Sequence, residues 1–241
     1  MGVRTPYYEE QLKGVESVGD KTSFSVEKIM SLNPDIIITY SEEQYDQLVQ
    51  IAPTVVVPYG QQDYRERLRE FAKILNREAE AEAWLAKLDQ KIETKKEELF
   101  KHVDQSEKVV ILELAQKEIY LMGKSYGRGG QIIYNDLGFR APAKVEEVAF
   151  KEGWASIALE SLPEFLGEAD HIFLGVRDSA VGTEGSQERK GEVTSLSVWK
   201  DLPAVKAGNV HEYQVQTFYF QDPIAIDNQL DFIVEQMISN R

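Results

Sequence analysis

The N-terminal part of the chain alternates between short apolar runs and helical patterns. The runs at 36–39 and 54–57 are almost wholly β-branched, as in strands that a parallel sheet buries on both faces. Helical spacing occupies 25–32 and 42–51, and a proline follows each pattern closely. A further apolar run at 15–18 predicts another short strand. Strands that alternate with helices in this way predict a parallel α/β sheet.

The middle of the chain is helical. An amphipathic segment covers 63–75, and a second covers 77–102 with mixed charges around one apolar stripe. A helix of the second length spans about 40 Å, which is more than a small lobe needs for its own crossover. It is therefore interpreted either as a strut between two lobes or as an ordinary solvated helix.

The α/β pattern then starts again. Two apolar runs at 109–114 and 118–122 predict a strand pair, and a glycine-rich turn follows at 123–130. The remaining elements expected are strands at 171–176 and 209–213 and helices at 131–137, 159–166, 197–206 and 222–239. The stretch 177–195 has three glycines and few apolar residues, so we expect a mobile surface loop there.

A weak internal repeat relates the first block to the third. The segment 26–29, with Glu27, leads through an Asp into the strand at 36–38, and the segment 159–162, with Glu160, leads through an Asp into the strand at 171–174. Any two α/β units share some of this pattern. The repeat nevertheless predicts two Rossmann-like α/β lobes with central, mostly parallel sheets, joined by one long helix around a ligand cleft. The expected boundaries are 1–76 for the N-terminal lobe, 77–102 for the interlobe helix and 103–241 for the C-terminal lobe.

Composition and charge narrow the possible classes of partner and of chemistry. The 241 residues include 27 Lys and Arg against 41 Asp and Glu, for a formal net charge of −14, and no cysteine. The acidity argues against nucleic acid or an anionic membrane surface as the main partner. The lack of cysteine excludes disulfides, zinc–thiolate and iron–sulfur sites and thiol catalysis. No apolar run reaches the length of a membrane span, and the first residues lack a signal-peptide pattern.

The candidate chemistry favours binding over catalysis. The Gly-Arg-Gly-Gly turn at 127–130 lacks both the full dinucleotide fingerprint and the lysine of a phosphate-binding loop. A nucleophile elbow is absent, and His102, His171 and His211 show no metal-ligand spacing. An enzyme with two α/β lobes remains the alternative from a different class. We expect no catalytic residues, no metal ligands and no cofactor.

Aromatic side chains and a few cations gather in the loops that follow the predicted strands, where ligands of parallel sheets bind. The residues expected to line the ligand site are Tyr40, Tyr59, Tyr120, Tyr126, Arg128, Arg177, Phe218 and Tyr219. An aromatic cleft with few cations suits a bulky ligand of low net charge.

At these residues the chain resembles the extracytoplasmic iron–siderophore binding proteins of ABC importers, a class with two lobes joined by a single helix. The resemblance covers nearly the whole chain and is carried by SVEKIMSLNPDIII (25–38), IAPTVVV (51–57), SYGRGGQIIYNDLG (125–138), WASIALESL (154–162), VWKDLPAVKAGNV (198–210) and TFYFQDP (217–223). The first and fifth of these also occur in cobalamin and haem binders. The third and sixth are similar to the ferric hydroxamate branch.

The resemblance assigns roles to individual residues. It implies that Arg128, beside Tyr126, contacts the iron-bound hydroxamate oxygens, and that Tyr219 and Tyr120 wall the pocket. It also implies that Glu27 and Glu160 dock on arginines of a membrane permease. The usual first strand and helix of the family are missing before Gly14-Val15, as are the signal peptide and lipid-anchored cysteine of Gram-positive members. We therefore expect a monomeric extracytoplasmic protein, lipid-anchored or periplasmic, in a chain that begins inside its N-terminal lobe.

Charge separates the possible chelates. A ferric trihydroxamate is uncharged at the metal and needs hydrogen-bond donors, which the planar guanidinium of Arg128 supplies. A ferric tricatecholate carries about three negative charges and needs several cations. Apart from Arg128, only Lys124 and Arg177 are candidates, so hydroxamate is favoured. A ferric citrate–hydroxamate, a catecholate, haem and cobalamin remain alternatives. For Arg128 itself the alternative is a turn arginine paired with a surface carboxylate.

Overall fold

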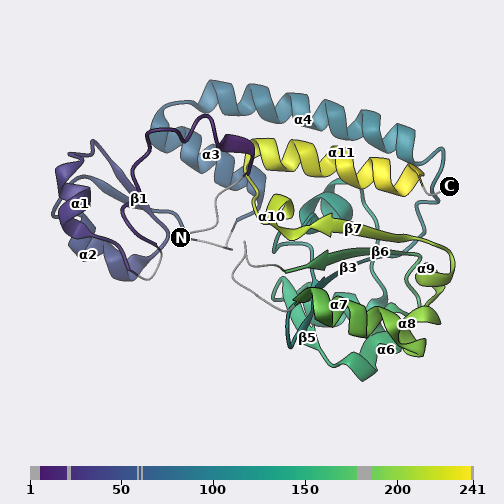
Figure 1. The fold of residues 1–241 in the computed structure, drawn as a ribbon. Helices are drawn as coiled ribbons and strands as arrows, with labels where there is room; N and C mark the ends of the chain where they lie inside the picture. The colour runs from purple at the N-terminus through teal and green to yellow at the C-terminus, as the bar shows by residue number, and fades with distance from the viewer. Residues whose placement is uncertain (1–5, 21–22, 59, 61, 178–185, 240–241) are drawn as a thin grey trace. The chain divides into compact units, whose positions relative to one another are not determined.

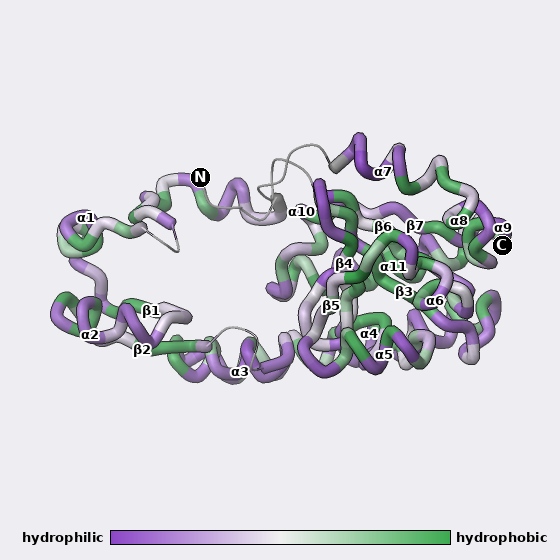
Figure 2. The backbone as a smooth tube through the Cα atoms, turned by 90° about the horizontal axis from the view of Figure 1, so that it is seen from below, coloured by the Kyte–Doolittle hydropathy of each residue, from purple (hydrophilic) through white to green (hydrophobic). Residues whose placement is uncertain are grey.

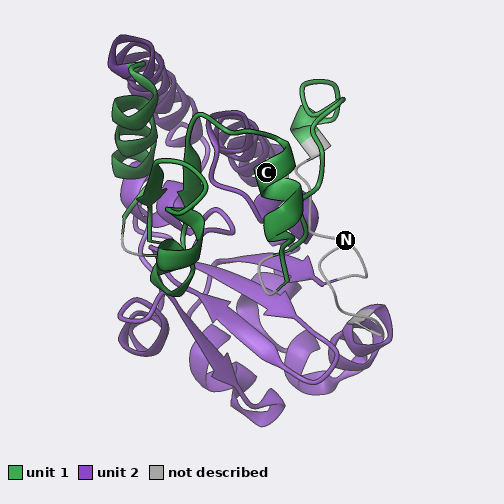
Figure 3. Ribbon diagram, turned by 90° about the vertical axis from the view of Figure 1, so that its left-hand side faces the viewer, with its two compact units in different colours: residues 1–77 green, residues 78–241 purple. Residues whose placement is uncertain are grey.

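The computed structural model describes residues 6–20, 23–58, 60, 62–177 and 186–239. Contacts divide the chain into two compact units, 1–77 and 78–241, shown in different colours in Figure 3. Each unit is an α/β assembly and is described by itself. Among the described helices, none combines the length and the apolar character needed to cross a bilayer.

Unit 1 is built on two parallel strands, in which Ile37 pairs with Thr54. Its elements are η1 (Pro6–Tyr8), α1 (Val26–Ser31), β1 (Ile37–Thr39), η2 (Glu42–Gln44), α2 (Tyr45–Leu48), β2 (Thr54–Val56) and α3 (Tyr64–Leu75). The Ser25 hydroxyl caps α1, and Asp63 with Glu66 forms a capping box at the start of α3. These caps confirm the predicted helix starts. The strand expected at 15–18 is wrong, because only an isolated bridge between Gly19 and Phe24 forms there.

Unit 2 contains a five-stranded sheet in the order β5-β4-β3-β6-β7. Its strands are β3 (Val109–Leu114), β4 (Ile119–Met122), β5 (Trp154–Ile157), β6 (His171–Val176) and β7 (Val210–Gln214). The strands β3, β6 and β7 run parallel, whereas β4 is antiparallel to both of its neighbours. All six residues of β3 are buried, which explains its continuous apolar run. The predicted pairing of 109–114 with 118–122 is confirmed as an antiparallel hairpin.

Helices and turns complete unit 2. They are α4 (Glu78–Leu99), the π-helical turn η3 (Gln131–Asp136), α5 (Ala143–Ala149), η4 (Leu159–Ser161), α6 (Leu162–Leu166), α7 (Ser186–Ser195), α8 (Ser197–Lys200), α9 (Pro203–Lys206), α10 (Val215–Phe218) and α11 (Pro223–Ser239). The helix expected at 77–102 is therefore α4, which ends at Leu99 and lies along α11 (Figure 1). Buried leucines of α4, such as Leu85 and Leu88, belong to the core of this unit.

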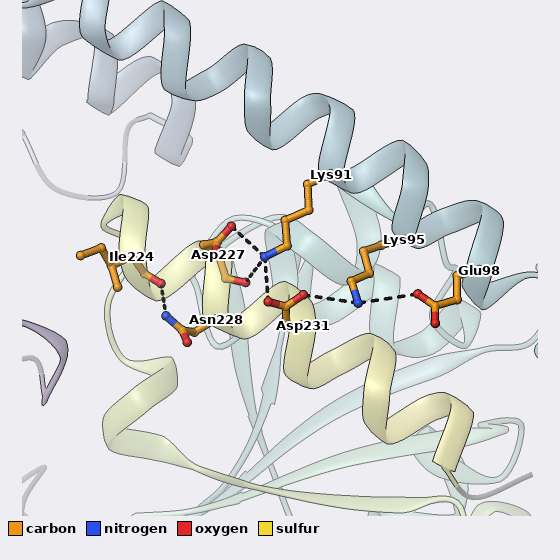
Figure 4. A network of polar contacts seen from close by, with 7 residues as sticks. All are labelled: Lys91, Lys95, Glu98, Ile224, Asp227, Asn228 and Asp231. Carbon is orange, nitrogen blue, oxygen red and sulfur yellow. Dashed lines mark hydrogen bonds and ion pairs between the residues drawn. The ribbon is translucent and has the colours of Figure 1, made fainter.

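A polar network joins the exposed edges of α4 and α11 (Figure 4). The Lys91 Nζ donates to Asp227 Oδ1 at 2.8 Å and to Asp231 Oδ2 at 2.7 Å. Lys95 also contacts Asp231, at 3.5 Å. Burial alone lowers the pKa of Lys91, but its hydrogen bonds to the two aspartates outweigh this and raise the pKa overall.

Two segments differ from the sequence-based expectations. Residues 186–195 of the expected loop form helix α7, whose Val193 is buried and which packs on β3 and β6. Figure 2 shows this helix as mostly hydrophilic, which is why periodicity missed it. The helix expected at 197–206 is two short helices, because Pro203 begins the second one. Residues 178–185 lie outside the described structure.

Candidate ligand-binding site

One row of residues crosses the sheet of unit 2 near the carboxyl ends of its parallel strands. Glu113 of β3 pairs with Tyr120 of β4 and with Gly175 of β6, and Gly175 in turn pairs with Tyr213 of β7. Directly paired residues project on the same face of a sheet. The register therefore places a carboxylate between two tyrosines, at the edge where parallel sheets bind their ligands.

Glu113 holds two arginines. The Arg128 Nε donates to Glu113 Oε2 at 2.6 Å, and the Arg177 Nε donates to Glu113 Oε1. The Glu113 side chain is fully buried, Arg128 is 3% exposed, and the Arg177 side chain is 24% exposed. Burial lowers the pKa of Arg128, but the charge of Glu113, its hydrogen bond with Arg128 and the nearby Tyr213 and Tyr126 together outweigh burial and raise the pKa, so the guanidinium stays protonated. Each arginine thus has its Nε edge turned to one shared carboxylate.

The glycine turn sets the position of Arg128. Gly127, Arg128 and Gly129 all have positive φ angles, of 106°, 58° and 83°. A left-handed conformation costs an arginine roughly 1–2 kcal/mol. Both glycines also lie close to other side chains: a Cβ on Gly127 would lie 2.8 Å from Gln221 Nε2, and one on Gly129 would lie 3.1 Å from Ile233 and 3.2 Å from Phe218.

Aromatic rings cover both guanidinium groups. The Cζ of Arg128 lies 4.3 Å from the centre of the Tyr219 ring and 5.8 Å from that of Tyr126. The Cζ of Arg177 lies 4.4 Å from the centre of the Tyr120 ring, and Trp154 meets that ring edge-on at 5.6 Å. Tyr219 and Trp154 are 38% and 42% exposed, so the outer aromatic layer faces solvent while the ion pair lies beneath it.

Tyr213 closes the inner side of the cluster. Its hydroxyl is buried and makes no well-formed hydrogen bond with the residues that the structure describes. Burial, and then the charge of Glu113, raises the pKa of Tyr213 well above its ordinary value, so the phenol is neutral. Phe218 packs against its ring at 4.7 Å. These two side chains form the apolar floor beneath the arginines.

Five of the expected site residues come together in unit 2: Tyr120, Tyr126, Arg128, Arg177 and Tyr219. Arg128 pairs with a fully buried carboxylate, and not with the surface carboxylate of the alternative interpretation. Phe218 is buried beneath this group.

The two remaining expected ligand-binding residues belong to residues 1–77 of the chain. Tyr40 follows β1 in unit 1 and is 47% exposed, and Tyr59 lies outside the described residues. Glu27 and Glu160 are exposed at the starts of α1 and η4.

Sequence reasoning missed three members of the cluster: Glu113, Trp154 and Tyr213. Glu113 had a signal, because a carboxylate inside a buried apolar strand requires cationic partners. The other two needed the strand register, since nothing in the sequence alone places Tyr213 opposite Gly175 or Trp154 beside Tyr120.

Unit 1 contains a cavity of about 690 Å³, lined mainly by apolar side chains of β1, α1 and the segment before α1. Phe24, Ile29, Ile37 and Phe71 are among them, and Asp20 is the one charged side chain among the described residues of the lining. The described lining contains no arginine or lysine, in contrast to the cluster in unit 2.

The unit 2 cluster is equipped to hold a ligand. Two permanent cations share one carboxylate under exposed aromatic rings, which suits oxygen acceptors on a bulky, weakly charged molecule. Among the described residues, no group of three or more His, Asp or Glu side chains is placed to hold a metal ion directly. The α/β fold and this site together define a solute-binding protein.

Comparisons with known proteins identify the family. The model of the family described as periplasmic binding protein matches residues 3–217, and the chain belongs to this family of binding proteins, which are not enzymes. The iron(3+)-hydroxamate-binding protein FhuD of Bacillus subtilis (strain 168) is 43% identical over 238 residues, which are 97% of this chain and 72% of FhuD.

Two solved structures are similar over nearly the whole chain. A FhuD fold-family periplasmic binding protein component of a ferrichrome ABC transporter from Bacillus subtilis has a TM-score of 0.79 and 42% identity, covering 97% of this chain and 85% of that one. FhuD2 from Staphylococcus aureus with bound ferrioxamine B has a TM-score of 0.82 and 26% identity, covering 98% of this chain and 87% of that one.

Proposed function

We propose that this chain is the substrate-binding protein of an ABC importer and captures a ferric hydroxamate siderophore outside the cytoplasm. The observation that carries the proposal is the buried Arg128–Glu113–Arg177 group under Tyr120, Tyr126 and Tyr219. The identity to a hydroxamate-binding protein and the likeness to a ferrioxamine complex support the same ligand class. Iron is cargo here, held by its chelator and not by protein side chains.

The chemistry of the ligand matches the donors. Hydroxamate oxygens bound to ferric iron carry partial negative charge, and guanidinium N–H groups are planar, charged donors for such oxygens. Tyrosine and tryptophan faces bury the apolar chains that link the hydroxamates. One net positive charge in the described cluster suits a neutral trihydroxamate better than a tricatecholate with about three negative charges.

The proposal extends to the importer. Glu27 stands in the first turn of α1 and Glu160 in the first turn of η4, and each of these elements precedes a parallel strand of its own unit. We propose that both exposed carboxylates pair with arginines of the permease. The same proposal includes a ligand cleft to which both lobes contribute, with Tyr40 and Tyr59 on the N-terminal lobe and the helix expected at 77–102 as the connection.

A fluorescence titration tests the ligand. Trp154 is the tryptophan beside Tyr120, so ferrioxamine B and ferrichrome should quench its emission with dissociation constants of about 1 μM or tighter. Arg128→Ala should weaken both by at least about tenfold, because it removes a charged hydrogen bond worth about 1.5–3 kcal/mol. Arg140→Ala removes an exposed arginine paired with Glu146 and should leave binding unchanged.

Calorimetry measures ligand binding independently of tryptophan quenching. Calorimetry should show that Trp154→Phe retains ferrioxamine binding after most of the quenching is lost. Tighter binding of a ferric citrate–hydroxamate or a tricatecholate than of either hydroxamate would reassign the ligand. Absence of heat and of quenching with every ferric chelate would overturn the proposed function.

A further inference from the structure

Glu113 is the residue through which both arginines of the site are held. Its two carboxylate oxygens accept separate bonds, one from Arg128 Nε and one from Arg177 Nε. These are the hydrogen bonds that the two guanidinium groups make with the described residues. With respect to the described part of the chain, the Nη groups of both arginines therefore keep their donors for another acceptor. A carboxylate placed at this point leaves two guanidinium edges available and cancels one of their two charges.

We infer that Glu113 is a positioning residue that also sets the charge specificity of the site, a role that rests on the proposed siderophore function. It orients the Nη edges of Arg128 and Arg177 toward the ligand oxygens. It also lowers the formal charge of the cluster from +2 to +1, with Tyr213 neutral. The site thereby favours chelates of low net charge over anionic ones.

The surroundings make this charge effective. Glu113 is fully buried and lies in the strand row between Tyr120 and Gly175, so water does not screen it from either arginine. Arg177 is partly exposed and its guanidinium lies over the ring of Tyr120, so it is the more solvent-accessible of the two cations. A change of one unit at Glu113 therefore acts at short range on the arginines and over a longer, partly screened distance on a ligand tail.

A series of ferrioxamine derivatives that share one iron-binding group but differ in net charge separates the effect of ligand charge from the effect of ligand shape. Ferrioxamine B has a free amine and a complex charge of +1, its N-acetyl derivative is neutral, and its N-succinyl derivative carries −1. All three present the same trihydroxamate to the site. For each protein variant, calorimetry at low ionic strength gives the affinity ratio of the succinyl form to the amine form.

Three substitutions in the cluster should change this affinity ratio in three different ways. Glu113→Gln raises the cluster charge and should shift the ratio toward the succinyl form by at least about fivefold. Arg177→Gln lowers the charge and should shift the ratio the other way. Glu113→Asp keeps the charge but withdraws the carboxylate by one methylene, so it should weaken all three chelates about equally. Both ratio shifts should shrink at 0.5 M salt.

Controls keep the outcomes distinguishable. Glu146→Gln makes the same chemical change in a glutamate paired with the exposed Arg140 and should leave the ratio unchanged. Circular dichroism and thermal unfolding report whether each variant folds, and Arg177→Gln tests the charge rule even if Glu113→Gln does not fold. A ratio that stays within twofold of wild type in folded Glu113→Gln and Arg177→Gln overturns the inference. Failure of all three chelates to bind the wild-type protein overturns the proposed function instead.

Discussion

Gly175 is the residue that lets the site form. A Cβ at this position would lie 2.5 Å from Cζ and 2.6 Å from the hydroxyl oxygen of Tyr213, so an alanine and this tyrosine ring cannot occupy the same row. The glycine lies between Glu113 and Tyr213 in the strand register. Its lack of a side chain therefore gives the buried phenol a place beside the carboxylate.

Substitution of Gly175 should be costly for this reason. Gly175→Ala should lower the free energy of unfolding by about 1–3 kcal/mol, because the ring or the strand must move to relieve the overlap. Urea denaturation measures the change. Gly191→Ala is the matched control, since Gly191 is exposed within α7 and a Cβ there meets nothing within 4 Å. The control should be neutral or stabilising by up to about 1 kcal/mol. Equal effects at the two glycines would contradict the steric explanation.

At the residue scale, a site residue could be predicted from the sequence where its residue type alone indicates the chemistry. The arginine in a glycine turn, Arg177 after a strand and the tyrosines of the loops were predicted, and five of these residues meet in the structure. Glu113 and Tyr213 were not predicted as site residues. Their role depends on register across three strands, and a one-residue slip in any of them would separate the groups.

The parallel strands of unit 2 are also joined at their opposite ends. His171, the first residue of β6, contacts His211 of β7 through Nδ1 and Nε2 at 2.9 Å. The other ring nitrogen of His171 lies 2.7 Å from Glu107 Oε2, just before β3. Both histidines are buried. This carboxylate–imidazole–imidazole chain links the amino ends of β3, β6 and β7, the end of the sheet opposite the ligand site.

The buried pair of His171 and His211 makes the free energy of unfolding depend on pH. Burial, and then the charge of His171, lowers the pKa of His211 to about 4 from its ordinary 6.5. The unfolded chain therefore binds a proton at His211 near pH 6.5, whereas the folded protein binds this proton only when the pH falls to about 4. The contribution of His211 to stability is complete above pH 6.5 and is lost as the pH falls toward 4, by up to about 3 kcal/mol.

Replacement of His211 by a group that does not titrate isolates this contribution. His211→Gln keeps a hydrogen-bonding partner for His171, so it should lose less stability than the wild type between pH 7.5 and pH 5. Urea unfolding followed by tryptophan emission at both pH values gives the difference. His102→Gln, at an exposed histidine, should follow the wild type. An identical acid sensitivity in the wild type and His211→Gln would exclude His211 as the source.

At the level of elements, continuous apolar runs were the most reliable signal. They predicted β1, β2, β3, β4 and β6; β3 and β6 are covered on both faces, as expected, whereas β1 and β2 are only partly buried, contrary to the expectation from their apolar runs. The helix α7 was missed, because its polar sequence buries Val193 but has no apolar stripe. Neither α5 nor β5 was predicted. Strand β5 exposes alternate residues at the edge of the sheet and therefore has no continuous apolar run.

The two units share one feature at the scale of the whole molecule. In each, an exposed glutamate, Glu27 or Glu160, stands at the start of a short helical segment that precedes a parallel strand. Neither side chain forms an ion pair or hydrogen bond with the described residues. The chain as a whole carries a formal charge of −14, which favours association with a basic surface.

The docking proposal therefore predicts a separation of binding from delivery. Glu27→Ala combined with Glu160→Ala should leave the ferrioxamine affinity unchanged and reduce permease-dependent uptake of radioactive iron by at least about tenfold, because each carboxylate loses a charged partner. Uptake is measured in cells that carry the permease but no binding protein of their own. Glu43→Ala with Glu147→Ala removes two other exposed glutamates, one from each unit, and should leave uptake close to the wild-type level. Reduced uptake in both double variants would trace the effect to net charge. Loss of ferrioxamine binding in the first would place Glu27 or Glu160 in the ligand site or the fold.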